Sequence, residues 1–393
     1  MRLFKIISVL TASVCLFSCT VHPESSLPES SVSQLDLVRR SESIQPEFDS
    51  QTEAASEYTP LNFSEPVGMW FPYMDYESYM YGKSSDEFRS SVREMFAEAV
   101  KKSVNTVYLH VRPCGDAYYS SSVFPSGTYL DGDYDPLQIM LEEAHGLGLS
   151  VHAWINPLRC QTTEQMKSLP DDFIVKQWTE TRTGSYVSIV NDRYYLNPAY
   201  DEVIDLICRG VDEIVRNYDV DGIHIDDYFY PTTSHEFDKT AFAVSGHTDL
   251  SQWRIENCNR LVHALYESVK RVDSDILFGI SPQGNINANY SSQYADVRQW
   301  AGNPGYCDYI IPQIYYGFRN ETCPFEETLA QWEALTTCES VSLIIGLAAY
   351  KQGQQDKWAG AAGELEWIEN PDIIKQQIEL VGSSSADGYA LYY

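Results

Sequence analysis

Short apolar runs alternate with segments of helical periodicity along most of this sequence. Eight runs rich in β-branched and aromatic residues span positions 67–73, 106–113, 150–157, 221–229, 276–284, 309–316, 342–350 and 388–393. Between them, apolar residues recur at three- and four-residue spacing over 86–102, 136–148, 201–218 and 251–272, with shorter segments at 294–301, 325–337 and 373–381. Strands that alternate with helices indicate an α/β fold with a parallel sheet.

The number and regularity of these runs favour a single closed barrel. No Gly-rich turn of the GxGxxG type follows the first run, which argues against a doubly wound open sheet, the alternative arrangement of such strands. We therefore predict a (β/α)8 TIM barrel over residues 63–393. The eighth run ends the sequence at Tyr393, so we expect a barrel whose last helix is missing.

The first 62 residues follow a different pattern. Arg2 and Lys5 precede an apolar run over 6–17, which is the order of a bacterial signal peptide, and this run is too short to span a bilayer permanently. It ends at Ser18 and Cys19, which resembles a lipobox, so we expect a signal peptide over 1–18 and a lipid on Cys19. Residues 19–62 are rich in Ser, Glu, Pro, Gln and Thr and predict a flexible tether.

This leader predicts a lipoprotein of the cell envelope that is held to the membrane only through its N-terminal lipid. No dense acidic run follows Cys19, which favours a periplasm-facing protein over one displayed on the outer surface.

The net charge of the full sequence limits the possible partners of the protein. Its 27 basic and 56 acidic residues give a formal net charge of -29, so repulsion opposes binding to nucleic acid or to an anionic membrane face. A neutral or amino-sugar polymer is compatible with this charge, and we expect a monomer. Apart from Cys15 and Cys19, the seven scattered cysteines form neither a CxxC zinc pattern nor a complete disulfide framework. We expect no metal and no cofactor.

Polar and aromatic residues gather at the C-terminal ends of the predicted strands, where barrel enzymes carry their active sites. These residues are Arg112, Asp116, Trp154, Asn156, Arg159, Asp226, Asp227, Tyr228, Ser281, Gln283, Gln313, Tyr315, Tyr316 and Tyr350. Because side chains alternate across a strand, His224, Asp226 and Tyr228 should share the inner face, and His110 should share it with Arg112. A carboxylate in that position needs a partner, and Arg112 is a candidate partner for Asp226. The aromatic rings are typical of platforms on which sugars stack.

Several of these strand ends together resemble one known family. The matching segments are 105–113 (NTVYLHVRP), 115–117 (GDA), 134–137 (YDPL), 152–159 (HAWINPLR), 221–231 (DGIHIDDYFYP), 279–282 (GISP) and 311–315 (IPQIY). In this order they resemble the glycosyl-hydrolase-like family 10 proteins, over a stretch from about residue 67 to the C-terminus. The resemblance implies a barrel glycoside hydrolase, often a lipoprotein, with a member that acts on peptidoglycan glycan strands lacking their stem peptides.

Glycosidases commonly use two carboxyl groups, and the sequence nominates one of them clearly. We predict Asp226 as the principal acid/base or orienting carboxylate. The second group is Asp227, Asp116 or a group of the sugar itself, because no Asp or Glu ends the fifth, sixth or seventh strand. The predicted substrate-binding residues are Arg112, Trp154, Asn156, Arg159, His224, Tyr228, Gln283, Gln313, Tyr315, Tyr316 and Tyr350.

Two alternative functions share the same pocket. His110, His152, His224 and Asp226 would converge on a divalent ion in a metal-dependent barrel hydrolase or deacetylase, although the first strand lacks the His-x-His that metal-dependent amidohydrolase barrels place there. The other alternative is a lipoprotein that binds glycans without cleaving them.

Overall fold

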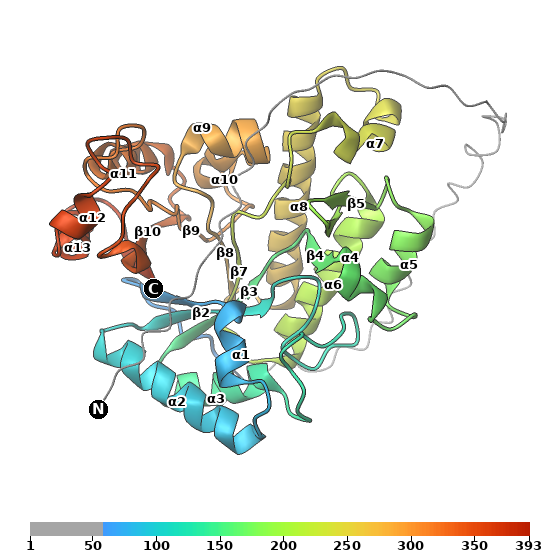
Figure 1. Cartoon of the computed structure of the whole chain (residues 1–393), viewed down its shortest axis with the longest axis horizontal. Coiled ribbons are helices and arrows are strands. Elements are labelled where there is room, and N and C mark those ends of the chain that lie inside the picture. The colour runs from blue at the N-terminus through green and yellow to red at the C-terminus, as the bar shows by residue number, and fades with distance from the viewer. Residues whose placement is uncertain (1–57) are drawn as a thin grey trace. The chain divides into compact units, whose positions relative to one another are not determined.

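Eight parallel strands close into a barrel in the computed structural model, which describes residues 58–393 (Figure 1). The expected signal peptide, the lipidated Cys19 and most of the expected tether lie outside the described residues. The strands follow one another around the barrel in chain order: β1 (Val67–Phe71), β2 (Thr106–Arg112), β3 (Ser150–Ile155), β7 (Gly222–Ile225), β8 (Leu277–Ile280), β9 (Tyr309–Ile310), β10 (Ser342–Ala348) and β11 (Gly388–Tyr392). All eight predicted strands are present, and the predicted TIM barrel is confirmed.

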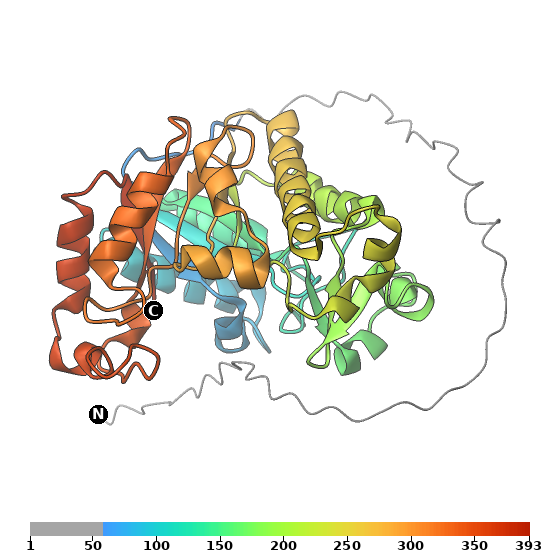
Figure 2. The ribbon, with the colours of Figure 1, turned by 90° about the horizontal axis from the view of Figure 1, so that it is seen from above.

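Helices connect successive barrel strands and pack on the outside of the sheet (Figure 2). The main ones are α2 (Ser85–Lys101), α3 (Pro136–Gly146), α6 (Asp201–Asn217), α8 (Leu250–Val272), α10 (Val297–Gly302), α11 (Phe325–Leu335) and α13 (Ile373–Val381). They begin at strong sequence signals: Ser84 caps α2 in a capping box with Glu87, and Asp135 caps α3 ahead of Pro136. The last element of the described residues is β11.

Short elements occupy the loops at the strand ends. They are η1 (Tyr73–Asp75), α1 (Tyr76–Tyr79), η2 (His235–Phe237), α7 (Lys239–Val244), α9 (Ile286–Ala288), the π-helix η3 (Asn289–Gln293), η4 (Ala349–Lys351) and α12 (Glu366–Glu369). Within residues 58–393, no helix combines the length and the apolarity needed to cross a membrane.

The segment between β3 and α6 forms a small subdomain of its own. It contains β4 (Arg159–Thr162), α4 (Thr163–Lys167), α5 (Ile174–Thr181), β5 (Val187–Val190) and β6 (Arg193–Leu196). The three strands pair in an antiparallel sheet in the order β4, β6, β5. This green region lies beside α6 in Figure 1. The sequence pattern did not predict these short elements.

Large hydrogen-bonded side chains fill the interior of the barrel. Trp70 Nε1 donates to His224 Nε2 at 3.1 Å, so the proton of the neutral His224 ring resides on Nδ1, 3.2 Å from Tyr309 Oη. Tyr309 Oη in turn donates to His152 Nδ1 at 2.7 Å. Gly279 makes room for the Tyr309 ring, since a Cβ added there would lie 1.8 Å from it. The interior is therefore a packed core and not a channel.

The N-terminal end of the barrel, its floor, is closed around one buried carboxylate. Asp221, directly before β7, accepts hydrogen bonds from Tyr58 Oη at 2.5 Å and from the backbone N–H of Val151 at 2.6 Å. It also accepts one from the backbone N–H of Leu61 and contacts His145 Nε2 at 3.0 Å. The residues that pack on the barrel thus include Tyr58 and Leu61, inside the range expected to be tether.

Candidate functional site

The inner face of β2 ends at a β-bulge, which removes one predicted residue from the barrel mouth. The pairing of β2 with β3 shifts register between His110 and Arg112, and a one-residue shift turns a side chain to the opposite face. The Arg112 guanidinium lies 4.5 Å from the centre of the Phe124 ring, and a Cβ added to Gly210 on α6 would meet its Nη1 at 2.6 Å. Arg112 therefore packs between the sheet and α6, and the expectation that it pairs with Asp226 is wrong.

Asp226 follows β7 and is 4% exposed. Its Oδ1 accepts hydrogen bonds from Asn156 Nδ2 at 2.5 Å and from the backbone N–H of Tyr228 at 3.2 Å. Asn156 Oδ1 lies 2.5 Å from His110 Nε2. The Asn156 amide nitrogen donates to Asp226, so its oxygen accepts a hydrogen bond from His110 Nε2. These two hydrogen bonds fix the orientation of the amide.

The environment of Asp226 favours the protonated carboxyl group. Burial, followed by the neighbouring charge of Asp227, raises the pKa of Asp226 to about 8, although Asn156, the Tyr228 N–H and Arg159 oppose the rise. Both donors use Oδ1, and within residues 58–393 no hydrogen bond reaches Oδ2. The proton of Asp226 therefore resides on an oxygen that is free to donate it.

Asp227 also lies at the mouth of the barrel. Gln313 Nε2 donates to its Oδ1 at 3.4 Å, and Gln293 Nε2 donates to its Oδ2 at 3.5 Å. The second amide is held in place because Gln293 Nε2 also donates to the Asp227 backbone carbonyl at 2.7 Å. Burial raises the pKa of Asp227, and the two glutamine amides counteract it. The two vicinal carboxyl groups thus have different partners.

Arg159, at the start of β4, brings a positive charge to this pair. Its guanidinium lies 4.9 Å from the centre of the Tyr228 ring and 6.0 Å from that of Tyr73. It lowers the pKa of Asp226, so it occupies the electrostatic position that the sequence analysis assigned to Arg112. Tyr228 itself is 42% exposed.

Three tyrosines form an aromatic cluster on the opposite side of the mouth, from the β9 to the β11 strand ends. The Tyr315 ring stacks on Tyr392 at 6.2 Å, and Tyr350 meets both rings edge-on at 6.1 and 5.7 Å. Tyr316 points to the β8 side, where a Cβ on Gly284 would touch its ring at 2.8 Å. The stacked and the edge-on tyrosines of this cluster can contact a sugar ring through their faces or their edges.

Gln283 lies beyond the end of β8 and extends the sheet at the barrel mouth. It forms an isolated parallel bridge with Gln313, which in turn bridges to Gly346. Within residues 58–393 the side-chain amide of Gln283 makes no hydrogen bond, whereas that of Gln313 holds Asp227 and the Ser281 carbonyl. Gln283 therefore keeps its polar group available for a ligand.

Three predicted site residues lie apart from the carboxylate pair. Asp116 Oδ1 accepts from the backbone N–H of Cys114 at 2.8 Å, and burial raises the pKa of Asp116 to about 6. No hydrogen bond or ion pair within the described range joins Asp116 to either vicinal aspartate. His224 is fully buried inside the barrel, and Trp154 stacks on His110 at 3.6 Å with 6% of its surface exposed. His224 and Trp154 thus lie in the barrel interior beneath the site, and neither is positioned as an exposed substrate ligand.

The three histidines do not converge as a metal site would require. Their hydrogen-bonding atoms face Asn156, Tyr309 and Trp70, as described above. Burial lowers the pKa of His152 to about 4 and lowers the pKa of His110 and His224 well below the usual value. Among residues 58–393, no group of three or more His, Cys, Asp or Glu side chains is placed to hold a metal ion.

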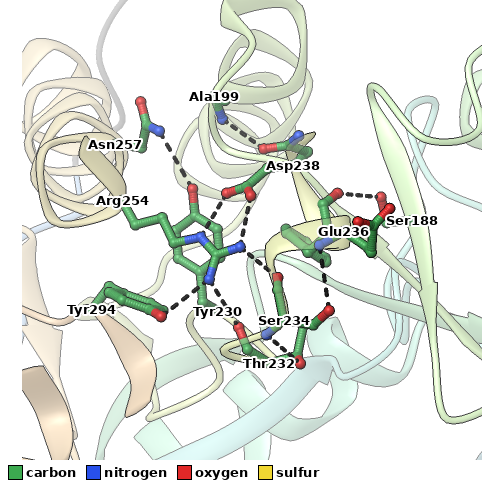
Figure 3. Close-up of polar contacts among 12 residues, drawn as sticks. Ser188, Ala199, Tyr230, Thr232, Ser234, Glu236, Asp238, Arg254, Asn257 and Tyr294 are labelled. Atoms are coloured by element: carbon green, nitrogen blue, oxygen red, sulfur yellow. Dashed lines mark hydrogen bonds and ion pairs between the residues drawn. The ribbon is translucent and has the colours of Figure 1, made fainter. Parts of the chain in front are cut away.

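The loop that follows the carboxylate pair is anchored by a buried ion pair on α8 (Figure 3). Arg254 donates to both oxygens of Asp238, at 2.6 and 2.8 Å, and both side chains are fully buried. Arg254 also donates to the Ser234 carbonyl at 2.7 Å and to Tyr294 Oη at 3.1 Å. This clamp ties the loop after β7 to the loop after the neighbouring β8, and it supports Gln293 because Tyr294 directly follows it.

Sequence reasoning missed three residues of the site. Tyr73 and Tyr392 lie at or just beyond the ends of β1 and β11, so the strand-end rule applied to the first and last strands would have found them. Gln293 carries no such signal. It ends the π-helix η3, and Tyr294 turns the chain with a left-handed φ of 55°, so its contact with Asp227 depends on the folded loop.

Comparisons with known proteins agree with this geometry. A profile of the family described as glycosyl hydrolase-like 10 matches residues 68–360. Glycosyl hydrolase YngK of Bacillus subtilis (strain 168) is 31% identical over 333 residues, which cover 77% of this chain and 63% of YngK, so the chain spans less than two thirds of that relative. Glycosyl hydrolase DigH of Escherichia coli (strain K12) is 31% identical over 309 residues, which cover 70% of this chain and 69% of DigH.

Among solved structures, the glycoside hydrolase domain of PgaB (BpsB) from Bordetella bronchiseptica superposes with a TM-score of 0.51 at 14% identity. The alignment covers 84% of this chain and 94% of that domain, and at this identity it speaks for the fold alone. The profile match over most of the barrel and the two relatives show that the chain belongs to the glycosyl hydrolase-like 10 family.

Proposed function

We propose that this protein hydrolyses O-glycosidic bonds in peptidoglycan glycan strands that have lost their stem peptides. The observation that carries the proposal is the pair formed by Asp226, whose buried carboxyl group holds its proton on a free oxygen, and Asp227 beside it. Exposed and partly buried aromatic rings surround the pair, as a sugar-binding site requires. The class of substrate follows from the family resemblance.

In the proposed reaction, Asp226 is the general acid. Its Oδ2 gives the proton to the glycosidic oxygen while the bond between that oxygen and the anomeric carbon breaks. Asp227 is the second carboxylate and stabilises the positive charge that develops on the sugar ring. A water molecule then adds its hydroxyl to the anomeric carbon, and its remaining proton restores Asp226.

The neighbouring side chains position this chemistry. Asn156 and the Tyr228 N–H occupy Oδ1 of Asp226 and so direct its other oxygen toward the substrate. Gln313 and Gln293 hold the Asp227 carboxylate. Sugars on either side of the cleaved bond would stack on Tyr228 and on the cluster of Tyr315, Tyr350 and Tyr392.

The test is a digestion of purified peptidoglycan by the purified protein, before and after an amidase has removed the stem peptides, with products identified by mass spectrometry. We expect new reducing ends in the stripped strands, few in the intact ones, and no effect of a chelator. Loss of activity on chelation would favour the metal-dependent alternative. Binding without any product would favour the glycan-binding alternative, and either result would refute the proposal.

We further propose that the protein is anchored in the cell envelope by a lipid on Cys19 and faces the periplasm. The proposal rests on the apolar run over 6–17 that ends at Ser18 and Cys19. Metabolic labelling with a lipid precursor should mark the wild-type protein and not Cys19→Ala. Equal labelling of the two proteins would refute the anchor without affecting the proposed reaction.

A further inference from the structure

We infer that Arg159 is a specificity residue that binds a carboxylate carried by the substrate sugar. The inference rests on the proposed function, because it concerns the same site and names the chemical group that the site selects. Arg159 is only partly exposed, and its guanidinium lies between the rings of Tyr228 and Tyr73. Within residues 58–393 its guanidinium nitrogens have no hydrogen-bond or ion-pair partner.

Arg159 lies at the barrel mouth without an acidic partner, although the protein has a large excess of acidic residues. Two other buried cations are paired, Arg254 with Asp238 at 2.6 Å and Lys351 with Asp356 at 2.8 Å. The buried Arg112 also has no hydrogen-bond partner, but it packs against the Phe124 ring outside the barrel mouth, where no ligand would reach it. Withdrawing a charge from water without a partner costs free energy. The missing partner of Arg159 is therefore best supplied by the ligand.

The acidic groups near Arg159 do not fill this role. Asp226 uses Oδ1 for Asn156 and Tyr228, and burial keeps it protonated in neutral solution. Asp116 is hydrogen-bonded to the Cys114 backbone and forms no ion pair with Arg159. The planar fork of a guanidinium binds a carboxylate through two parallel hydrogen bonds. Within residues 58–393 no protein group uses the fork of Arg159.

Stripped glycan strands carry such a group. The stem peptide is joined to the lactyl group of each muramic sugar through an amide, and hydrolysis of that amide leaves a carboxylate. Arg159 would therefore bind the group that appears when the peptide is removed. This contact provides a physical reason for a preference for stripped strands, since an amide at that position is neutral and continues into a peptide.

The experiment compares two substrates that differ only in this group: stripped strands, and the same strands with their carboxylates chemically reduced to alcohols. We expect the wild-type protein to have about 10- to 100-fold lower kcat/KM on the reduced strands, mainly through KM. In Arg159→Met the ratio between the two substrates should fall close to one, and in Arg159→Lys it should be intermediate, because a lysine keeps the charge and loses the fork.

Arg182→Met is the matched control, since Arg182 also lies over a tyrosine ring, at 5.4 Å from Tyr186, but is exposed and contacts neither carboxylate of the pair. It should keep the wild-type ratio. Equal cleavage of both substrates by the wild-type protein, or an unchanged ratio in Arg159→Met, would overturn the inference while the proposed hydrolysis stands. Absence of cleavage of either substrate by the wild-type protein would instead refute the proposed function.

Discussion

Two aspartates at opposite ends of β7 show how differently the same side chain is used in this barrel. Asp221 precedes the strand at the floor, and Asp226 follows it at the mouth. Both are almost completely buried, at 0% and 4% exposure. Burial raises the pKa of Asp221 as well, yet hydrogen bonds from His145, Tyr58 and two backbone N–H groups outweigh it, and its pKa lies below the usual value.

The difference lies in the number of donors. Asp221 has partners on both oxygens, and they stabilise its charge and tie the chain before β1 to the floor. Asp226 has donors on one oxygen only and a second carboxyl group beside it. The effect of burial on its pKa therefore outweighs that of the hydrogen bonds, and the carboxyl group keeps its proton. A fully bonded carboxylate is a structural element, whereas an incompletely bonded one is available for proton transfer.

The strongest test of this comparison is the effect of Asp226→Asn on turnover. An amide has nearly the same shape but cannot give up a proton as an acid does, so kcat on stripped strands should fall by about 10² to 10⁴. Circular dichroism should show an unchanged fold. Wild-type turnover in Asp226→Asn together with a loss in Asp227→Asn or Asp116→Asn would show that another carboxyl group is the acid.

The counterpart at the floor, Asp221→Asn, should act on stability. An asparagine retains one acceptor oxygen and turns an NH2 group toward donors such as the Val151 N–H, so we expect a loss of about 2–4 kcal/mol at pH 7. Because the folded pKa of Asp221 is lowered, its stabilisation is present above the unfolded pKa of about 3.9 and is lost as the pH falls through the folded value. The difference in Tm between the two proteins should therefore disappear in acid. A Tm gap that stays constant down to acidic pH would contradict this assignment.

The stability of Asp226→Asn relative to the wild type should change with pH in the opposite direction to that of Asp221→Asn. The folded pKa of about 8 lies above the unfolded value, so the folded wild-type protein binds the extra proton and loses stability as the pH rises from about 4 to about 8. The asparagine variant lacks this loss and should be more stable than the wild type above pH 8. Thermal melts at pH 5 and pH 9 measure the effect. Equal Tm differences at both pH values would mean that Asp226 is not protonated in the folded state.

The smallest effect is expected at Asn156, whose amide lowers the pKa of Asp226. In Asn156→Leu this hydrogen bond is absent, so the alkaline limb of the profile of kcat/KM against pH should move to higher pH by up to about one unit. His110→Gln should move it less, because the glutamine can still orient the Asn156 amide. A shift to lower pH in Asn156→Leu would contradict the arrangement of donors around Asp226.

The periodicity of the sequence was sufficient for the fold. Eight β-rich runs with helical segments between them required a parallel sheet, and the helix bounds agree within a few residues because caps such as Ser84 and Asp135 act locally. It also placed Asp226, Asp227, Asn156 and Gln313 correctly at the mouth. Each of these residues lies within three positions of the end of a strand, so only the direction of a regular element was needed.

The remaining features of the site were decided by tertiary structure. A bulge in β2 turns Arg112 outward, which simple alternation along the strand does not predict. Arg159 reaches the carboxylates because a subdomain folds between β3 and α6, and Gln293 reaches Asp227 at the end of a π-helix. The sequence by itself therefore determined which strands exist and which residues stand at their ends, because those depend on neighbours along the chain. Which cation and which amides face the carboxylates depended on loops that take their shape only when distant segments pack together.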